Sequence, residues 1–392
     1  MSEWKEYKLE DFTTIHNETR IPLSKMERSK RQGKYPYYGA SGIIDYLDDY
    51  LFDGEYVLIS EDGENLKSRQ TPIAFKANGQ FWVNNHAHIV KGKKDFHNNL
   101  IIYYFKNLDL NPFITGAVQP KLNKANLLSI PLFLPEKEEE QKAIAEVLSS
   151  LDDKIDLLHR QNKTLEQMAE TLFRQWFVEG AKEDWEEGTL GDVIDIFDNK
   201  RIPLSKMQRN KMKEGKLYPY YGAASVMDFV NDYIFDGEYI LLGEDGTVRT
   251  DEGYPVLQYA TGKFWVNNHT HIFQAKAPYN NFFIWNYLSK KNIDRIVTGA
   301  VQPKINQTNL KSLEFPTYPN KLVNEFIEIT NSQFEKINKN KSQIHTLEKM
   351  RDTLLPKLMS GEVRVQSLRN ETFVKQETIN NPSSVGAKQK KN

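Results

Sequence analysis

The stretch FWVNNHAHI at residues 81–89 returns 183 residues later as FWVNNHTHI at residues 264–272, with a single substitution. Other matched segments accompany it in the same order. They are RIPLSKM at 20–26 and 201–207, YPYYGA at 35–40 and 218–223, FDGEY at 52–56 and 235–239, and TGAVQPK at 115–121 and 298–304. A period this long indicates a duplicated domain, because solenoid repeats span only about 20–50 residues.

Each copy predicts an α+β head. FDGEYVLIS at 52–60 and FWVNNHAHIV at 81–90 alternate in polarity and are rich in β-forming residues, so each is predicted to be a strand. Long connections that contain Gly, Pro and Asn separate these strands. In the second stretch, His86 and His88 are expected to share one face of a strand, and the stretch itself is expected to be a scaffold element.

A long helix is predicted after each head. Residues 136–179 contain neither Pro nor Gly, and their apolar residues recur at alternating steps of three and four. Asn162 falls at a core position of this seam, where a polar residue fixes the register of a helix pair. The seam residues are Ile144, Leu148, Leu151, Ile155, Leu158, Leu165, Leu172 and Trp176, and those of the second helix, within 321–360, are Phe326, Ile337, Ile344, Leu347, Leu354 and Leu358.

Two such helices in a duplicated chain predict an antiparallel coiled coil with pseudo-two-fold symmetry that separates two similar heads. The predicted organisation has five segments, of which the last is expected to be disordered because it is polar and rich in Asn, Lys and Ser. The segments are head 1 at 1–135, a helix at 136–180, head 2 at 181–319, a second helix at 320–366 and a tail at 367–392.

The charge balance, the cysteine content and the lack of long apolar runs limit the classes of protein to which this chain can belong. Lys and Arg total 52 against 53 Asp and Glu, so a claim of nucleic-acid binding must depend on local patches and not on net charge. The sequence contains no cysteine, which excludes disulfides, cysteine zinc sites and thiol catalysis. The polar N-terminus and the lack of any long apolar run predict a cytoplasmic protein that does not enter a membrane.

Basic residues gather in matching stretches of the two heads despite the balanced total charge. Such a recurring bias suits contact with phosphate groups, whereas the alternative is an ordinary solvated loop. The candidate DNA-binding residues are Arg20, Lys25, Arg28 and Arg31 in head 1, and Arg201, Lys206, Arg209 and Lys211 in head 2.

Two further loops carry candidate base contacts. In TGAVQPK, Gln119 and Gln302 offer an amide to an adenine edge, and Lys121 and Lys304 offer an ammonium to phosphate or guanine. The alternative is a plain turn closed by Gly and Pro. The second loop lies between matched segments in both copies. It reads ENLKSRQ at 64–70 and TVRTDEG at 247–253, so the two versions have equal length and different sequences.

This variable loop is where the sequence preferences of the two heads are expected to diverge, through Lys67 and Arg69 in head 1 and Arg249 in head 2. Replacing Lys67 and Arg69 together is predicted to change the preference of the first head. Drift of an unconstrained surface loop is the alternative.

The sequence offers few candidates for catalytic or metal-binding residues. A His-x-His pair such as His86 and His88 can ligate a metal, but no third ligand at a suitable local spacing accompanies it, so structural histidines are favoured. Glu61 and Asp62 are acidic neighbours that fit a turn better than a catalytic pair. Neither a GxxxxGK[ST] phosphate loop nor a GxGxxG dinucleotide motif occurs. We therefore predict no catalytic and no metal-binding residue.

Taken together, these motifs resemble the specificity subunit of type I restriction–modification systems. Both heads begin W-x-x-x-x-L-x-D and carry a YPYYGA segment, an FDGEY strand and a long helix. LFRQWFVEG at 172–180 is similar to the central conserved region of that family, and LLPKLMSGEVRV at 354–365 to its distal region.

The resemblance implies a function. Each head would be a target recognition domain that reads half of a gapped, bipartite site in double-stranded DNA, and the helices would set the gap. Two methyltransferase subunits would bring S-adenosylmethionine and methylate adenine in each half-site. Restriction and translocase subunits, using ATP and Mg²⁺, would cut unmodified DNA. The chain itself would be non-catalytic and would hold no cofactor.

Two other functions stay open at this stage. A scaffold with two protein-binding heads would bind its partners without the salt dependence that DNA binding shows. A self-sufficient methyltransferase would have to bind S-adenosylmethionine through the isolated chain, which the missing motifs disfavour.

Overall fold

The computed structural model describes residues 3–116, 118–181, 185–299 and 301–365, and it divides into two compact units. Unit 1 consists of residues 1–157 and 343–392, and unit 2 of residues 158–342. Each unit therefore contains one head and one end of each long helix. Because the division runs through both helices, the boundaries at 135, 180 and 319 stay predictions. The predicted disordered tail lies outside the described residues.

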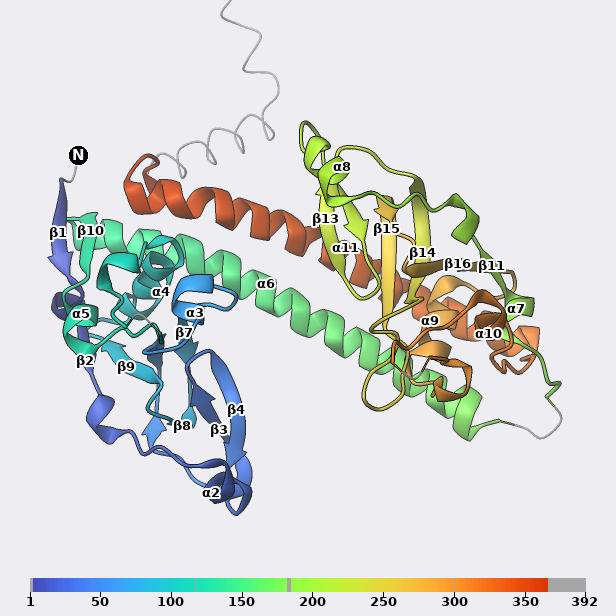
Figure 1. Cartoon of the computed structure of the whole chain (residues 1–392), viewed down its shortest axis with the longest axis horizontal. Coiled ribbons are helices and arrows are strands. Elements are labelled where there is room, and N and C mark those ends of the chain that lie inside the picture. The colour runs from blue at the N-terminus through green and yellow to red at the C-terminus, as the bar shows by residue number, and fades with distance from the viewer. Residues whose placement is uncertain (1–2, 117, 182–184, 300, 366–392) are drawn as a thin grey trace, which may run out of the picture. The chain divides into compact units, whose positions relative to one another are not determined.

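Head 1 is built on two four-stranded sheets with strand orders β2-β9-β6-β7 and β4-β3-β8-β5, and on a two-stranded β1-β10 ribbon. All described pairs are antiparallel except β3 with β8. Figure 1 shows the β3–β4 hairpin and α2 on the side of head 1 away from the first turns of α6. The elements are β1 (Trp4–Lys8), α1 (Leu9–Phe12), β2 (Thr13–Ile15), η1 (Asn17–Thr19), α2 (Lys25–Ser29), β3 (Gln32–Gly39), β4 (Gly42–Leu47), β5 (Phe52–Asp53), β6 (Tyr56–Ser60), α3 (Asn65–Ser68), β7 (Ala74–Ala77), β8 (Gln80–Val83), β9 (Ala87–Gly92), α4 (His97–Asn107), η2 (Asn111–Phe113), α5 (Lys124–Leu128) and β10 (Pro131–Pro135).

Head 2 repeats this plan in one six-stranded sheet, β11-β16-β14-β15-β12-β13. Strand β14 continues through the positions that β5 and β6 hold in head 1, and β15 through those of β7 and β8, so the two sheets merge. The elements are α7 (Leu190–Val193), β11 (Ile194–Ile196), η4 (Asp198–Lys200), α8 (Lys206–Lys211), β12 (Tyr218–Tyr221), β13 (Val226–Val230), β14 (Phe235–Gly243), β15 (Leu257–Val266), β16 (Thr270–Ala275), α9 (Asn281–Ser289), η5 (Asp294–Ile296) and α10 (Gln307–Lys311). The predicted α+β class and the duplication are confirmed.

The FWVNNHAHIV stretch is two strands and not one. Strand β8 ends at Val83, and β9 begins at Ala87. The Asn84 side chain accepts a hydrogen bond from the backbone N–H of His86 at 2.8 Å, which closes a turn of the kind that asparagine favours. The expectation that His86 and His88 share a strand face is therefore wrong, because the turn places His86 outside the sheet.

Both long helices are present as α6 (Glu138–Phe173), followed by the π-helical η3 (Arg174–Glu179), and α11 (Asn320–Ser360). In unit 1 their ends run antiparallel, since Asp152 of α6 contacts Arg351 of α11, and Glu140 near the start of α6 contacts Arg364 just after α11. Leu148 of α6 and Leu358 of α11 are fully buried in the same core as Leu100 and Ile101 of α4. The head is thus fixed to both helices by a shared apolar core.

Unit 2 has the same antiparallel arrangement. The Phe173 and Phe326 rings pack 5.7 Å apart, and Asn340 donates to Asn162 Oδ1 at 2.9 Å. The predicted core position of Asn162 is confirmed, and Asn340 is the partner that sequence analysis did not find. Beyond Asn162 the most buried residues of α6 include Ala169 and Phe173, whereas the predicted seam residues there are only partly buried.

Candidate nucleic-acid interface

In head 1, three separate segments meet in a charged loop cluster made of Arg20, Glu61 and Lys121. Arg20 follows η1, Glu61 follows β6, and Lys121 ends the TGAVQPK loop. The Arg20 guanidinium lies 2.6 Å from one carboxylate oxygen of Glu61, and the Lys121 ammonium lies 3.4 Å from the other. Burial by itself would raise the pKa of the Glu61 carboxyl. The hydrogen bond from Arg20 and the nearby positive charges outweigh burial, so the pKa is lowered overall and the carboxyl stays ionised.

Head 2 reproduces this charged loop cluster with Arg201, Glu244 and Lys304. The corresponding distances are 2.7 and 3.4 Å. Each arginine also donates to a carbonyl at the start of a strand, Arg20 to Ala87 at 2.8 Å and Arg201 to Thr270 at 2.9 Å. The cluster therefore holds several loops of each head at one end of the sheet.

A buried histidine lies beside each cluster, and its surroundings differ between the heads. His88 donates from Nε2 to the Leu122 carbonyl at 2.7 Å and accepts at Nδ1 from the Asn17 amide at 2.8 Å, which requires a neutral ring. Burial lowers the pKa of His88, in agreement with that state.

In head 2, Asp198 replaces Asn17. His271 faces the Ile305 carbonyl at 2.8 Å and the Asp198 carboxylate at 2.6 Å, so both of its ring nitrogens face acceptors. Although burial raises the pKa of the Asp198 carboxyl, the hydrogen bond from His271 lowers it below its ordinary value. One residue difference thus changes a neutral hydrogen bond into a charge-assisted one.

Head 2 also brings Asp198, Glu244 and His271 together with ligating atoms within 4.8 Å of one another. Arg201 and Lys304 contact the same two-carboxylate group, Arg201 at 3.6 Å from Asp198. These cations already balance the carboxylate charges, which disfavours a metal ion there. The two histidines of the His-x-His pair have different partners: His86 lies 2.8 Å from Asp62, whereas His88 contacts the Leu122 carbonyl and Asn17.

The arginines of the basic stretches are engaged within their own heads. Arg28 contacts Asp45 and Arg209 contacts Asp228, each at 2.9 Å. Arg31 lies 3.0 Å from Asp48. Sequence analysis missed these carboxylates because they lie 17–19 residues further along the chain, Asp45 on β4, Asp48 just after β4 and Asp228 on β13.

The lysines of the same stretches are placed differently. Lys25 and Lys206 begin α2 and α8, and Lys211 ends α8; all three are exposed, and the described residues offer them no ion-pair partner. Gln119 and Gln302 are also exposed at the tips of the TGAVQPK loops. These side chains are free to meet a ligand from outside the head.

In the variable loop, Lys67 lies exposed on α3, whereas Arg69 has a structural role. Arg69 adopts a positive φ of 50° and donates to the carbonyls at the end of α4, including that of Lys106 at 3.1 Å. In head 2, Arg249 lies 3.1 Å from Asp294. Both arginines therefore attach the variable loop to the body of the head.

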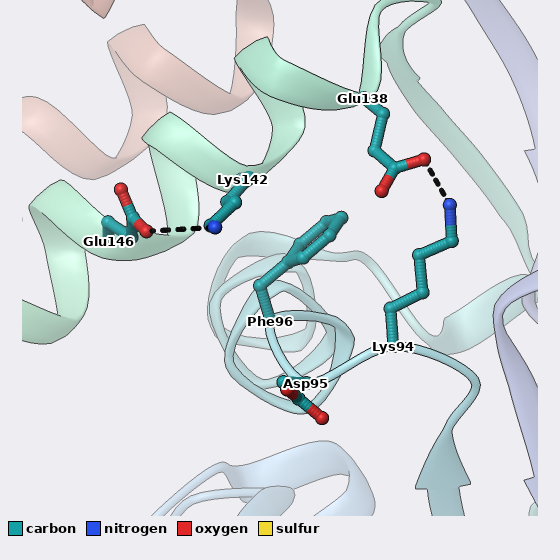
Figure 2. Close-up of a pocket in the computed structure, with 6 residues that line it drawn as sticks. All are labelled: Lys94, Asp95, Phe96, Glu138, Lys142 and Glu146. Carbon is teal, nitrogen blue, oxygen red and sulfur yellow. Dashed lines mark hydrogen bonds and ion pairs between the residues drawn. The ribbon is translucent and has the colours of Figure 1, made fainter.

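Unit 1 also contains a recess of about 530 Å³ between the segment before α4 and the first turns of α6. Figure 2 shows the Phe96 ring directed toward α6, with Lys94 paired to Glu138 and Lys142 paired to Glu146. Three carboxylates against two ammonium groups make this lining unsuited to phosphate, so we do not include it in the interface.

The chain thus consists of two related heads, each packed on one end of an antiparallel helix pair and each with several loops at one end of a sheet. The model of the type I restriction modification DNA specificity domain matches residues 1–167 and 182–349, and the chain belongs to this family. No helix in the described part of the chain has the length and apolarity to span a bilayer.

Individual relatives agree with this assignment. The chain is 38% identical over 150 residues to the protein S.HindORF215P of Haemophilus influenzae, named as a type I restriction enzyme specificity subunit, covering 38% of this chain and 37% of that protein. It is 26% identical over 308 residues to the MjaIX specificity subunit of Methanocaldococcus jannaschii, covering 68% and 69%. The fold matches the crystal structure of a type I restriction–modification S subunit from M. genitalium, with a TM-score of 0.61 at 18% identity, over 91% of this chain and 96% of that one.

Proposed function

We propose that this chain reads a gapped, bipartite target in double-stranded DNA and directs two methyltransferase subunits, and restriction subunits with them, to that target. The observation that carries the proposal is the charged loop cluster, which occurs in both heads. In each head it brings the TGAVQPK loop, which has the same sequence in both copies, close to the variable loop at one end of the head. A protein that reads two related half-sites needs such a combination, because shared contacts orient each head and differing contacts set its preference.

The chemistry in this proposal belongs to the partners. The methyltransferase subunits would bind S-adenosylmethionine and methylate adenine in each half-site, and the restriction subunits would use ATP and Mg²⁺. This chain would be the non-catalytic subunit of a cytoplasmic complex. Lys25, Lys206 and Lys211 would contact phosphate, while Lys67 and the two loop glutamines, Gln119 and Gln302, would face the bases.

Mapping methylated adenines tests the proposal directly. The chain is co-expressed with its methyltransferase subunit, and the modified positions are determined across a DNA of known sequence. A two-part motif with a fixed unread gap, lost when this chain is omitted, is the expected result. Copurification of the two proteins without any modified motif would favour a scaffold, and S-adenosylmethionine binding by the isolated chain would favour a methyltransferase.

The exposed lysines give a quantitative prediction. Replacing Lys25 and Lys206 by alanine is expected to weaken DNA binding of the complex equally for all sequences, and to reduce the slope of log K against log salt by about 0.9 for each phosphate that the complex no longer neutralises. Binding is measured by fluorescence anisotropy at several salt concentrations. Lys349→Ala, on the exposed surface of α11, is the matched control that should leave the slope unchanged.

Sequence preference is best tested at Lys67 alone. Arg69→Ala removes hydrogen bonds to the end of α4, so a double substitution at these two positions would mix folding with recognition. Lys67→Ala is expected to relax the methylation motif in one half-site and to leave the other intact. An unchanged motif would remove the variable loop from the reading surface.

A further inference from the structure

The most exposed large apolar side chains of the described chain lie at equivalent positions in the two heads. Val118 and Val301, in the TGAVQPK loops, are each 99% exposed. A single exposed apolar residue is ordinary on a protein surface. Two fully exposed valines at matching positions of identical loops call for a common explanation, which their surroundings help to provide.

Each loop is closed at its base by backbone hydrogen bonds. In head 1, Thr115 and Lys121 exchange backbone hydrogen bonds of 2.8 and 2.7 Å, and Gly63 donates to Pro120 at 3.0 Å. In head 2, the pair Thr298–Lys304 has the same two distances, and Gly246 donates to Pro303 at 3.0 Å. The base of each loop is therefore a hydrogen-bonded frame that includes Lys121 or Lys304 of the charged loop cluster.

The turn that projects the valine depends on a glycine. Gly116 has a φ of +86°, and a Cβ atom there would lie 2.2 Å from the Gln119 carbonyl oxygen. Gly299 has the same φ and the same clash with Gln302. Any other residue would open this turn. The backbone is thus specialised to hold a valine and a glutamine out to solvent.

The identity of the two loops contrasts with the variable loops beside them. Residues 115–121 match 298–304 at every position, whereas 64–70 and 247–253 differ. Under the proposed function, on which this inference rests, the two half-sites differ in sequence but share one element: each contains an A·T pair whose adenine is methylated. Identical loops suit that shared pair.

The side chains match the chemistry of such a pair. Valine methyl groups pack on the C5-methyl group of thymine, which only thymine presents in the major groove. A methyltransferase takes its target base out of the helix, which leaves the opposite thymine without its Watson–Crick partner. A primary amide supplies one donor and one acceptor, as the vacated thymine edge requires.

We propose that Val118 and Val301 pack on the methyl group of the thymine opposite the methylated adenine, one in each half-site, and that Gln119 and Gln302 face the edge of the same thymine. These residues would read the base pair that the two half-sites have in common. The chemistry of the ligand is therefore a thymine within duplex DNA, at a position fixed relative to the methylated base.

A uracil scan tests this assignment in the complete complex with its methyltransferase subunits. Each thymine of the mapped target is replaced in turn by uracil, which removes only the C5-methyl group. For the unaltered protein we expect affinity to fall about fourfold at one thymine in each half-site, the effect of removing one buried methyl group. Val118→Ala should abolish that sensitivity in one half-site, and Val301→Ala in the other.

The controls separate recognition from folding. Both valines are exposed, so the variants should melt like the unaltered protein. Val178→Ala, at a residue that is 61% exposed on η3, should leave the uracil scan unchanged. Val118→Thr retains one of the two valine Cγ methyl groups, so it should keep more of the sensitivity to uracil than Val118→Ala does.

Three results would overturn the inference. The first is a uracil scan in which both alanine variants behave like the unaltered protein. The second is a sensitive thymine that does not lie opposite the methylated adenine. The third is weaker binding of the methyltransferase subunit by the variants in the absence of DNA. If the unaltered complex methylates no bipartite motif, the proposed function fails before the scan begins. A normal motif with an unchanged scan removes only the role of the valines.

Discussion

The charged loop clusters of units 1 and 2 match closely. An apolar core joins each head to the long helices, but the contacts made beyond that core differ between the units. In unit 1, the Tyr103 hydroxyl of α4 and the Arg351 guanidinium of α11 both donate to the Asp152 carboxylate of α6, at 2.8 and 2.7 Å. In unit 2, the contact is aromatic: Phe334 of α11 packs 4.8 Å from Phe282 of α9 and 4.9 Å from Tyr259 of β15, measured between ring centroids.

This difference shows which constraints act on each surface. Beyond the apolar core, a head can contact a helix through a hydrogen-bonded ion-pair network or through aromatic packing, because both leave few unsatisfied groups away from water. The loop cluster has no such freedom, since its geometry must present the same loops on both heads. The contacts between the heads and the helices therefore differ between the two units, whereas the charged loop clusters do not.

The largest predicted effect is in the aromatic contact of unit 2. Phe282→Ala deletes a side chain that is 4% exposed and is expected to cost about 3 kcal/mol of unfolding free energy through reduced burial and a residual cavity. Urea unfolding, with hydrogen exchange of the α9 and α4 peptides, measures where the loss falls. Protection should fall in α9 and persist in α4; a uniform loss would contradict two separately attached heads.

The corresponding change in unit 1 should be smaller and sensitive to salt. Asp152→Ala leaves the buried Tyr103 hydroxyl and Arg351 without their shared acceptor, and we expect a loss of about 1–2 kcal/mol. In 1 M NaCl the difference from the unaltered protein should shrink, because screening already weakens the network. The Phe282→Ala effect should not shrink, so the same salt response for both variants would erase the distinction between the two contacts.

The smallest effect concerns the two buried histidines. Asn17→Asp gives His88 the carboxylate that His271 already has, so we expect His88 to titrate at a higher pH than in the unaltered protein, with less than about 1 kcal/mol change in stability at pH 8. Imidazole NMR shifts report the titration. Asp198→Asn, the reciprocal variant in head 2, should leave the His88 titration unchanged.

The sign of the pH effect follows from the lowered pKa of His88. Burial disfavours the protonated ring in the folded state, so the unfolded chain binds more protons below the ordinary value of 6.5. Head 1 should therefore keep full stability above that pH and lose stability as the pH falls through the lowered pKa. Asn17→Asp should reduce this acid-induced loss; a loss of the same size would exclude His88 as its source.

Features that depend on local pattern were predictable. The first part of the α6 seam, which includes Ile144, Leu148, Ile155 and Leu158, followed from apolar spacing, because a 3.5-residue period marks the buried face of a paired helix wherever the partner lies. Asn162 was identified as a buried polar position, but its partner Asn340 was not, because pairing across 178 residues depends on helix alignment.

Features that depend on distant partners were missed. Arg20, Arg28 and Arg69 carry a charge that suits DNA, yet each is engaged by a group of its own head. Sequence spacing could not reveal these partners, because they lie 17 to 41 residues away along the chain and only the folded head brings them together. The identity of the TGAVQPK loops was visible, whereas the exposure of Val118 was not.

The sequence by itself determined the duplication, the α+β class, the two long helices and the family, because repetition, periodicity and motif order are properties of the chain. Tertiary structure alone decided which charges remain available for a ligand. Ion pairs form between residues far apart in sequence, and their formation depends on the distances and burial that the folded heads impose. The exposed lysines and the projecting valines could therefore be recognised only in the fold.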